Sequence, residues 1–379
     1  MTTYGVLSTY PPTQCGLATF SAALVRALRS DEDVVDVVAL VDRIESGFPS
    51  EVRHQWVRGE PGGESRAAAR LNTNDIVIVQ HEYGIFGGAD GGDVLDLVRQ
   101  LHVPVVVVFH TVLEAPTVRQ RSILLELSRR CDSVVTMTWT ARRRLINQYG
   151  VPASRITVIP HGASDIHVRG VRWTPPAPKA RPVLLTWGLL GQGKGIEWGI
   201  AAMALLRDVH PAPIYRIVGG IHPKVAAREG EAYRRRLERQ VRELGVENMV
   251  AFDDRYIDTD ELQGIVADAD FILLPYDSRD QVTSGVLVEA VTAAKPVVST
   301  GFPHAVELLS RGMGLLVERQ SASSIAAAVR RLIEDPQLAQ RMSDDARTAA
   351  KDLLWPAVAD RYRDLAESLP NRSFESVSA

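Results

Sequence analysis

The sequence predicts an α/β protein with two Rossmann-like domains in tandem. Short apolar runs without alternating polar positions recur along the chain, and stretches with helical periodicity separate them. Such runs are typical of strands buried on both faces, as in parallel sheets that helices cover on both sides. A stretch dense in proline and basic residues, HVRGVRWTPPAPKARP, divides the runs into two sets and indicates an extended linker.

The apolar runs predict the strands in order along the chain. The first set predicts strands at 5–8, 37–41, 76–80, 103–109, 133–136 and 157–159. The second set predicts strands at 183–187, 215–218, 250–252, 271–274, 296–299 and 314–317. The segment from Trp355 has apolar residues at helical spacing, and we expect this helix to pack back on the first domain. The expected organisation is a first domain at 1–165, a linker at 166–181, a second domain at 182–350, a crossing helix at 351–370 and a disordered tail at 371–379.

Composition and charge are those of an ordinary globular protein. The 379 residues suffice for two domains with separate cores, and 45% of them are hydrophobic and 23% charged. The net charge of −3 gives no reason to expect a nucleic-acid partner. The two cysteines, Cys15 and Cys131, are far apart and indicate a reducing compartment without a disulfide framework. No signal peptide and no apolar run of about 20 residues is evident, so we expect a cytoplasmic protein.

The segment LPYDSRDQVTSGVLVEAVTAAKPVVST, at 274–300, is the most informative part of the chain. A strand is expected to end just before it, and a helix to begin near Thr283, Ser284 and Gly285. Small residues at a helix start allow backbone N–H groups to face a phosphate, and the helix dipole favours negative charge there. Glu289, about a turn and a half further on, is placed to accept hydrogen bonds from ribose hydroxyls. The segment therefore predicts a nucleotide-sugar site.

A glycine-rich loop in the second domain, GLLGQGKG, precedes a helical pattern. It holds Lys194 among glycines that include Gly188 and Gly193. A lysine beside exposed backbone N–H groups is suited to a diphosphate leaving group. Gly195 stands where a P-loop has serine or threonine, so the loop is not a P-loop. A solvated loop lysine is the structural alternative.

The first predicted strand leads into a loop with Gly16, before a helical pattern that runs from Thr19. A strand, a glycine loop and a helix in succession suit the approach of a phosphate or sugar, and a turn glycine with a structural role is the alternative. The dinucleotide fingerprint G-x-G-x-x-G is missing here. The neighbouring Cys15 is interpreted as a small residue that lines a cleft rather than as a nucleophile.

Histidines end three buried runs of the first domain. The run VPVVVVFHT ends at His110 and Thr111, and VQHEYGIFGG places His81 and Glu82 at a strand end before a glycine-containing loop. A neutral imidazole at His110 can donate hydrogen bonds to a sugar hydroxyl or a phosphate, but it is a poor general base without a partner that tunes it. For His81 and Glu82, substrate contact and a structural or solvated role both remain open. In VIPHG, His161 has a domain-border turn as its alternative.

No metal site is predicted. The D-x-D patterns at 258–260 and 268–270 lie among helix-favouring residues and are interpreted as surface carboxylates. The arginine clusters at 142–144 and 234–236 are interpreted as solvated helix faces. For the first cluster, weak association with an anionic membrane surface is the alternative.

Taken together, these motifs resemble those of the retaining glycosyltransferases of family 4, also called group 1 glycosyl transferases, over nearly the whole chain. The most specific parts are GLLGQGKG and SGVLVEAVTAAKPVVST. The resemblance implies the GT-B fold, in which two facing Rossmann-like domains enclose a cleft and a C-terminal helix crosses back to the first domain. It also implies that Glu289 holds the donor ribose and that Lys194 neutralises the donor diphosphate. By the same resemblance, His110 lies near the transferred sugar and Gly16 belongs to the first loop.

Two positions depart from the family pattern. The first Glu of the family's E-x7-E region falls on Gln281, with Asp280 beside it, and the arginine of the lysine loop is replaced by Leu189. Charged hydrogen bonds are worth about 1.5–3 kcal/mol, so the lost cation can cost about tenfold in donor affinity unless Arg279 replaces it.

The resemblance implies retaining transfer of a hexose, mannose or glucose, from a nucleoside diphosphate sugar to a sugar, a glycolipid or another alcohol. No cofactor or metal is expected, because Lys194 and the helix dipole stabilise the leaving diphosphate. Two alternatives stay open: a nucleotide-sugar epimerase of the same architecture, and a nucleotide-sugar-binding protein with reduced catalysis. The expected site residues are His110, Lys194 and Glu289 for catalysis, Gly188, Gly193, Gln281, Thr283, Ser284, Gly285 and Glu289 for donor binding, and Gly16, His81, Glu82 and Thr111 for an acceptor or phosphate loop.

Overall fold

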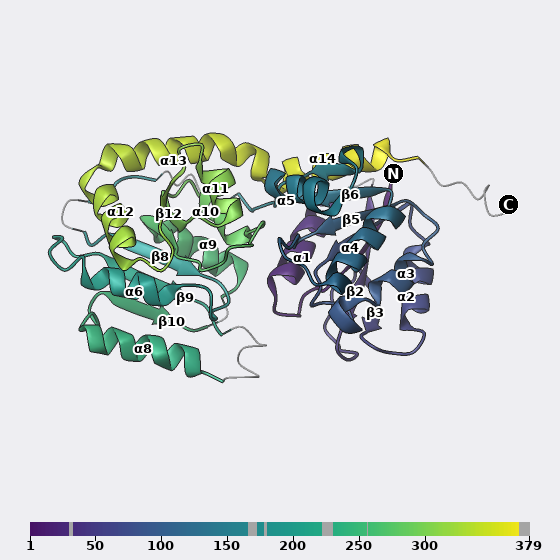
Figure 1. Ribbon diagram of the computed structural model, residues 1–379, viewed down its shortest axis with the longest axis horizontal. Coiled ribbons are helices and arrows are strands. Elements are labelled where there is room, and N and C mark those ends of the chain that lie inside the picture. The colour runs from purple at the N-terminus through teal and green to yellow at the C-terminus, as the bar shows by residue number, and fades with distance from the viewer. Residues whose placement is uncertain (30–32, 166–172, 178–179, 222–229, 256, 371–379) are drawn as a thin grey trace. The chain divides into compact units, whose positions relative to one another are not determined.

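The computed structural model describes residues 1–379 with the exception of 30–32, 166–172, 178–179, 222–229, 256 and 371–379 (Figure 1). The chain divides into two compact units. Unit 1 consists of Met1–Gly162 and Trp355–Ala379, and unit 2 of Ala163–Leu354. Much of the predicted linker at 166–181 and the whole predicted tail at 371–379 lie outside the described residues.

Unit 1 is built on a seven-stranded sheet whose neighbouring strands all run parallel. The order β3-β2-β1-β4-β5-β6-β7 places β1 beside β4, where the direction of strand succession reverses. Ligands of such sheets bind beyond the carboxyl ends of the strands near this point. The strands are β1 Thr3–Ser8, β2 Val34–Val41, β3 Val52–Val57, β4 Ile76–His81, β5 Val105–Phe109, β6 Ser133–Thr136 and β7 Ile156–Val158.

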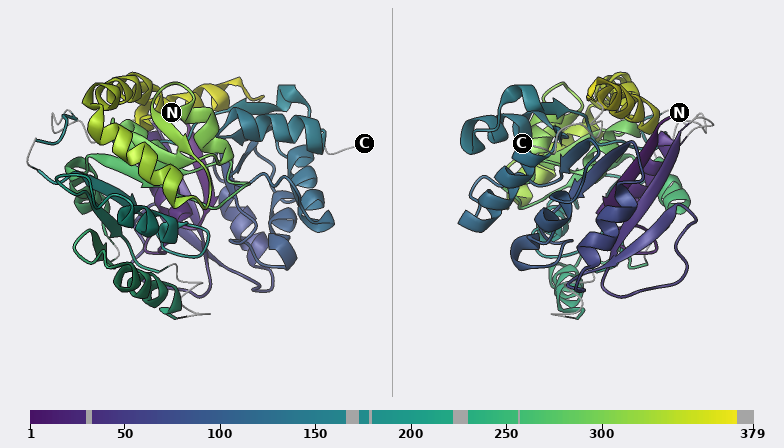
Figure 2. Two further views of the ribbon diagram at one scale, coloured as in Figure 1. Left: turned by 60° about the vertical axis from the view of Figure 1, so that its left-hand side comes forward. Right: turned by 90° about the vertical axis from the view of Figure 1, so that its right-hand side faces the viewer.

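One face of this sheet is covered by the first and last helices of the chain. Phe20 and Leu24 from the first share a hydrophobic core with Trp355, Val358 and Tyr362 from the last. In the right-hand view of Figure 2, the yellow last helix lies on the other side of the sheet from the teal helices. The predicted return of the C-terminal helix to the first domain is confirmed. The helical segments of unit 1 are α1 Gly16–Leu28, α2 Gly63–Leu71, η1 Ala89–Gly91, α3 Val94–Val98, α4 Val118–Arg130, α5 Trp139–Arg144, η2 Leu145–Tyr149, η3 Ala153–Arg155 and α14 Trp355–Ser368.

Unit 2 has a six-stranded parallel sheet in the order β10-β9-β8-β11-β12-β13. Ile200 and Val329 belong to one hydrophobic cluster of this unit, and Leu287 and Val291 to a second one. The strands are β8 Val183–Trp187, β9 Ile214–Val218, β10 Val250–Asp253, β11 Phe271–Leu274, β12 Val297–Thr300 and β13 Gly314–Val317. The helical segments are α6 Ile196–Ala204, α8 Ala232–Leu244, α9 Thr259–Asp268, α10 Gly285–Thr292, α11 Pro303–Leu309, α12 Ala322–Glu334, α13 Pro336–Ala350 and η5 Lys351–Leu353.

The predicted strands agree with the structure to within three residues, but β3 is missed. Its sequence, VRHQWV, has three polar residues in a row at its centre, because it is an edge strand of the sheet and is mostly half-buried. Helix α1 begins at Gly16 rather than at Thr19, because the thiol of Cys15 caps it by accepting the N–H of Ala18 at 3.3 Å. Gly16 is therefore the first helical residue, and Cys15 is a helix cap rather than a residue that only lines a cleft.

Two glycines inside helices of unit 2 allow a matched test of packing. An added Cβ at Gly199, in α6, would lie 2.7 Å from the ring of Tyr215, whereas one at Gly264, in α9, would meet nothing within 4 Å. The ring of Tyr215 is fixed by a buried hydrogen bond of 2.9 Å between its hydroxyl and Thr186. We expect Gly199→Ala to lower the free energy of unfolding by about 1–3 kcal/mol and Gly264→Ala to raise it by about 0.5–1 kcal/mol. Equal effects of the two variants in urea denaturation would contradict this packing.

Candidate functional site

The carboxyl edge of the unit 2 sheet brings two loops into direct backbone contact. The N–H of Asp277, after β11, donates to the carbonyl of Gly193, after β8, at 2.9 Å. An added Cβ at Gly195, whose φ is +64°, would overlap the carbonyl of Pro275. Only glycine fits at this point, so the lysine loop depends on it to reach β11.

The start of the lysine loop is held in the same way. The N–H of Gly188 donates to the carbonyl of Val218 at 3.0 Å, and an added Cβ at Gly219 would overlap the carbonyl of Gly188. Gly188 and Gly193 have φ angles of +112° and +87°, which side-chain-bearing residues rarely adopt. Both predicted glycines therefore shape the loop through their backbones.

Lys194 extends from this loop with its ammonium group over an aromatic ring. Its Nζ lies 4.2 Å from the ring centroid of Tyr276, within the range of a cation–π interaction. No carboxylate in the described part of the chain forms an ion pair with it. Burial lowers the pKa of Lys194 from 10.5 to about 8. An anion beside the ammonium would favour the charged form and raise that pKa again.

Helix α10 begins at Gly285 with Ser284 as its N-cap. The hydroxyl of Ser284 accepts the N–H of Leu287 at 3.3 Å. The N–H of Ser284 donates to Nδ1 of the buried His304 at 2.8 Å. This imidazole was not expected from the sequence, and it occupies a backbone N–H group that was expected to face a phosphate. By helix geometry, the N–H groups of Gly285 and Val286 are the ones that remain for a ligand.

Glu289 lies further along α10 and also has a protein partner. Its Oε2 accepts the indole N–H of Trp187, the last residue of β8, at 3.1 Å. Burial raises the pKa of this carboxyl from 4.5 to about 7. The buried hydroxyl of Tyr276 has no hydrogen-bond partner in the described part of the chain, and burial together with the charge of Glu289 raises its pKa. Lys194, Tyr276 and Glu289 thus form a group of under-partnered polar side chains, as is typical of a functional site.

Gln281 and Thr283 lie in the loop that precedes α10. The side-chain amide of Gln281 donates to the carbonyl of Thr283 at 3.1 Å, and its backbone N–H donates to the hydroxyl of Ser278 at 3.1 Å. The hydroxyl of Thr283 is buried and has no partner among the described residues. Arg279, the expected replacement cation, is exposed. Thr283 therefore offers an unused hydroxyl beside the helix start, whereas Gln281 is engaged within the loop.

At the carboxyl edge of the unit 1 sheet, His110 follows β5 and lies in a largely buried position. Its Nε2 is 2.7 Å from Oε1 of Gln80 in β4, and the ring of Phe20 packs edge-on at 4.8 Å between centroids. Burial, together with the nearby His161 and His81, lowers the pKa of His110 well below 6.5. His110 is therefore a neutral imidazole held by Gln80. The role of Gln80 was not expected, although a polar residue at the end of the apolar run IVIVQH is a usable signal.

His161 follows β7 and packs against the same phenyl ring. The ring of Phe20 lies 4.8 Å from that of His161 and 5.1 Å from that of Trp355. Nδ1 of His161 donates to the carbonyl of Gly162 at 2.7 Å, and burial lowers its pKa to about 4. An added Cβ at Gly162 would overlap the indole of Trp355. The chain leaves unit 1 after Gly162 and returns to it at Trp355. The alternative of a domain-border turn therefore fits His161.

His81 is enclosed by aromatic rings rather than open to a ligand. Its side chain has no exposed surface, and the rings of Tyr83, Phe109 and Phe86 lie 5.0, 5.3 and 6.0 Å away. Neither ring nitrogen has a hydrogen-bond partner in the described part of the chain, and burial lowers the pKa to about 3. The expectation of substrate contact is therefore corrected for His81, because a fully enclosed side chain cannot touch a substrate.

The remaining residues expected near the acceptor join two strand ends. The hydroxyl of Thr111, after β5, donates to the carboxylate of Glu82, after β4, and both residues are half-buried. This bond holds two neighbouring loops together at the carboxyl edge of unit 1. Gly16 is exposed, and an added Cβ there would meet nothing within 4 Å, so no crowding by the protein demands glycine at this position.

Two charged residues differ from the solvated roles expected for them. Asp270 is half-buried and accepts the N–H of Val183 at 2.7 Å, and burial raises its pKa. Arg144 is 8% exposed and donates to the carbonyl of Val112 at 2.6 Å, so it is not part of a solvated helix face.

Among the described residues, no group of three His, Cys, Asp or Glu side chains is arranged to hold a metal ion. No helix in the described ranges is both long and apolar enough to cross a membrane.

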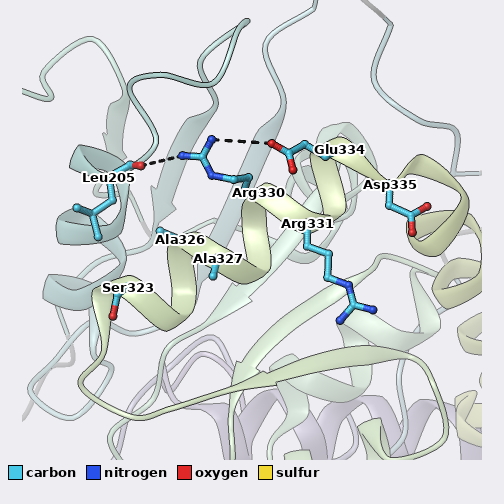
Figure 3. A pocket seen from close by; sticks show the side chains of 8 residues that line it. All are labelled: Leu205, Ser323, Ala326, Ala327, Arg330, Arg331, Glu334 and Asp335. Atoms are coloured by element: carbon cyan, nitrogen blue, oxygen red, sulfur yellow. Dashed lines mark hydrogen bonds and ion pairs between the residues drawn. The ribbon is translucent and has the colours of Figure 1, made fainter.

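A shallow pocket of unit 2 lies between the end of α6 and helix α12 (Figure 3). Arg330 lies at this pocket, donates to the carbonyl of Leu205 at 3.2 Å and forms an ion pair with Asp208 at 2.7 Å. None of the predicted donor or acceptor residues lines it. The pocket is therefore separate from the group around Lys194.

Two Rossmann-like units, with polar groups collected at the carboxyl edges of their sheets, define a protein of the GT-B class. A family model described as glycosyl transferases group 1 matches residues 171–349, and one described as glycosyltransferase family 4 matches residues 15–165. The chain belongs to this family of glycosyltransferases.

The most similar relatives include glycogen synthase of Mycobacterium tuberculosis (strain CDC 1551 / Oshkosh), which is 29% identical over 62% of this chain and 53% of its own. D-inositol 3-phosphate glycosyltransferase of Corynebacterium jeikeium is 29% identical over 63% of this chain and 58% of its own. The chain thus spans little more than half the length of the curated relatives it matches.

Solved structures of low sequence identity share the fold. Anabaena HepE in complex with UDP and glucose matches with a TM-score of 0.74 at 18% identity, covering 97% of this chain and 100% of that one. Sucrose-phosphate synthase from Thermosynechococcus elongatus matches with a TM-score of 0.72 at 19% identity, covering 97% and 98%. The predicted GT-B fold is confirmed.

The raised pKa of Glu289 predicts a pH-dependent contribution to stability. Glu289 titrates near 4.5 in the unfolded chain and near 7 in the folded protein, so the folded state holds more protons between these values. This contribution is fully present below about pH 4.5 and is lost as the pH rises through 7. We expect the free energy of unfolding of the wild type, minus that of Glu289→Gln, to fall by about 1–3 kcal/mol between pH 4.5 and 8. Denaturant titrations at several pH values measure this difference, and a difference independent of pH would contradict the burial of Glu289.

The contact between Gln80 and His110 predicts how the histidine titrates. In the wild type we expect His110 to stay neutral at pH 6, because burial lowers its pKa well below 6.5. Gln80→Glu places a carboxylate at the ring nitrogen, and we expect the pKa of His110 to rise by about 1–3 units. Histidine NMR titration measures the shift, with the exposed Gln148→Glu as control. An unchanged titration of His110 in Gln80→Glu would show that the contact does not form.

Proposed function

We propose that this protein is a retaining glycosyltransferase that moves a hexose, with mannose or glucose as first candidates, from a nucleoside diphosphate sugar to an alcohol acceptor. The observation that carries the proposal is the group formed by Lys194, the start of α10 and Glu289. Neither charged side chain of this group has an oppositely charged partner in the described part of the chain. The HepE structure that shares this fold contains UDP and glucose, and this supports a nucleotide-sugar donor here.

On the donor side, the leaving diphosphate lies against Lys194 and the N–H groups of Gly285 and Val286. Their contribution is electrostatic, because each donor points to where negative charge develops as the glycosidic bond breaks. The ribose hydroxyls donate to Glu289 and favour its ionised form, which reverses the effect of burial on its pKa. The hydroxyl of Thr283, buried beside the start of α10, is an additional hydrogen-bond donor for the diphosphate.

On the acceptor side, His110 acts as a neutral hydrogen-bond acceptor for a sugar hydroxyl. The amide oxygen of Gln80 accepts the N–H of its Nε2, so Nδ1 of the neutral ring carries no proton and is the nitrogen left to face a ligand. Its lowered pKa makes it a poor proton acceptor, which fits a transfer in which the departing diphosphate supplies the base. Attack from the face of the leaving group retains the configuration without a protein nucleophile. The reaction is proposed to need no metal, because Lys194 and the helix dipole offset the diphosphate charge.

Removal of either donor-binding charge tests the proposal directly. We expect Lys194→Ala and Glu289→Ala to lower the transfer rate by about a hundredfold or more while the protein remains folded, because each removes stabilisation of a charged group at the donor. Lys351→Ala, at an exposed lysine, is the matched control and should change the rate less than about twofold. Rates are measured by release of the nucleoside diphosphate, and near-normal activity in both site variants would overturn the assignment.

The donor and the reaction are identified by two further measurements. Thermal unfolding with UDP-, GDP- and ADP-sugars selects the donor, because a bound ligand raises the melting temperature. NMR coupling constants of the product's anomeric proton then report whether the configuration is retained. Conversion of the donor without an acceptor would favour an epimerase, and binding without transfer to a broad acceptor panel would favour a binding protein.

A further inference from the structure

The ammonium group of Lys194 lies over the ring of Tyr276, and this ring is itself held in place by packing. Tyr276 is 1% exposed, and its ring stacks on that of Phe302 with 5.4 Å between centroids and 22° between planes. Its backbone carbonyl accepts the hydroxyl of Thr300 at 2.5 Å. The ring is therefore fixed by packing on one side and by the neighbouring strand β12 at its backbone.

The backbone of Lys194 is fixed relative to this ring as well. Its N–H donates to the carbonyl of Gly191 at 3.2 Å. The carbonyl of Gly193 accepts the N–H of Asp277, the residue after Tyr276. Gly195 lies so close to Pro275 that no other residue fits there. The lysine is thus held by the residues before and after Tyr276, and its side chain extends over the ring between them.

The ring offers the ammonium group an interaction that a carboxylate or an aliphatic side chain does not. A carboxylate at this place would pair with Lys194 and compete with an incoming diphosphate. An aliphatic side chain would leave a buried ammonium with nothing to offset its desolvation, which favours loss of the proton. The negative face of an aromatic ring attracts the cation without neutralising it, so the charge stays available for an anion.

We propose that Tyr276 is a positioning residue that holds Lys194 in place and charged at the site of the donor diphosphate. The ring, and not the hydroxyl, does this, because the hydroxyl is buried and has no partner in the described part of the chain. The inference rests on the proposed function for its consequence in donor binding, but the contact itself can be tested without a donor.

The test on the free protein measures the titration of Lys194 by NMR with labelled lysine. The chain has five lysines, and Lys194→Met identifies the signal. We expect Tyr276→Leu to lower the pKa of Lys194 below its value of about 8 in the wild type, because the ring no longer stabilises the charge. We expect Tyr276→Phe to recover the wild-type value. An unchanged titration in Tyr276→Leu would overturn the proposal whatever the donor is.

The second test measures the affinity of UDP, ADP and GDP by calorimetry in a double-mutant cycle. We expect Tyr276→Leu to weaken binding of the preferred nucleotide by about tenfold when Lys194 is present and by less than about twofold in the Lys194→Met background. Tyr276→Phe should recover most of the affinity lost in Tyr276→Leu. Equal losses in both backgrounds, or a loss in Tyr276→Phe as large as in Tyr276→Leu, would overturn the proposal.

The two tests separate failure of this inference from failure of the proposed function. If no nucleotide binds but the titration of Lys194 responds to Tyr276→Leu and not to Tyr276→Phe, the contact stands and the donor assignment is wrong. Thermal unfolding of each variant shows whether it is folded, since Tyr276 also packs on Phe302. If Tyr276→Leu does not fold, Tyr276→Met keeps an apolar side chain of similar length, and a titration of Lys194 unchanged in that variant overturns the proposal.

Discussion

The donor site proposed for unit 2 depends on the desolvation of Lys194 and Glu289, which form no ion pair within the described part of the chain. Desolvation lowers the pKa of the lysine to about 8 and raises that of the carboxyl to about 7, so each charge costs free energy in the absence of a ligand. Their protein contacts, the ring of Tyr276 and the indole N–H of Trp187, orient both groups but do not neutralise them. In the proposed function, a diphosphate and a ribose supply the missing partners, and the lysine acts where charge develops during the reaction.

This arrangement is possible because backbone, and not side chains, fills the space between the loops after β8 and β11. Gly188, Gly193 and Gly195 adopt positive φ angles, and the last lies against the carbonyl of Pro275. A larger residue at Gly195 would overlap this carbonyl, so the lysine loop could not keep its place against β11. In unit 1, the largely buried His110 carries no charge that desolvation would destabilise. Its contact with Gln80 orients the ring.

The elements and the donor motifs could be predicted because they follow from local patterns. Apolar runs, glycine loops and a helix start with small residues are signals within a few neighbouring positions. The residues that hold the site residues in place could not be predicted. Gln80, Tyr276 and His304 act through contacts between elements that are distant in sequence. His81 shows the same limit of prediction from sequence. A histidine at a strand end has the same sequence pattern whether its side chain faces a ligand or, as here, a cluster of aromatic rings. The edge strand β3 was not expected, because a continuous apolar run is typical only of strands buried on both faces.

A comparison of the half-buried Lys194 with the buried Lys295 shows what distinguishes the lysine of the proposed site. Burial lowers the pKa of Lys295 to about 8, as for Lys194. Yet the ammonium of Lys295 donates to the carbonyls of Ala267 and Ala269, both at 2.7 Å, and so caps the end of α9. The hydrogen-bonding capacity of Lys295 is thus used within the fold, whereas the ammonium of Lys194 lies over the ring of Tyr276 and has no ion-pair or hydrogen-bond partner among the described residues. A shifted pKa alone does not separate the two lysines, and the difference lies in their partners. The carbonyls use the hydrogen bonds of Lys295 within the fold, whereas those of Lys194 remain for the anion that the proposed function requires.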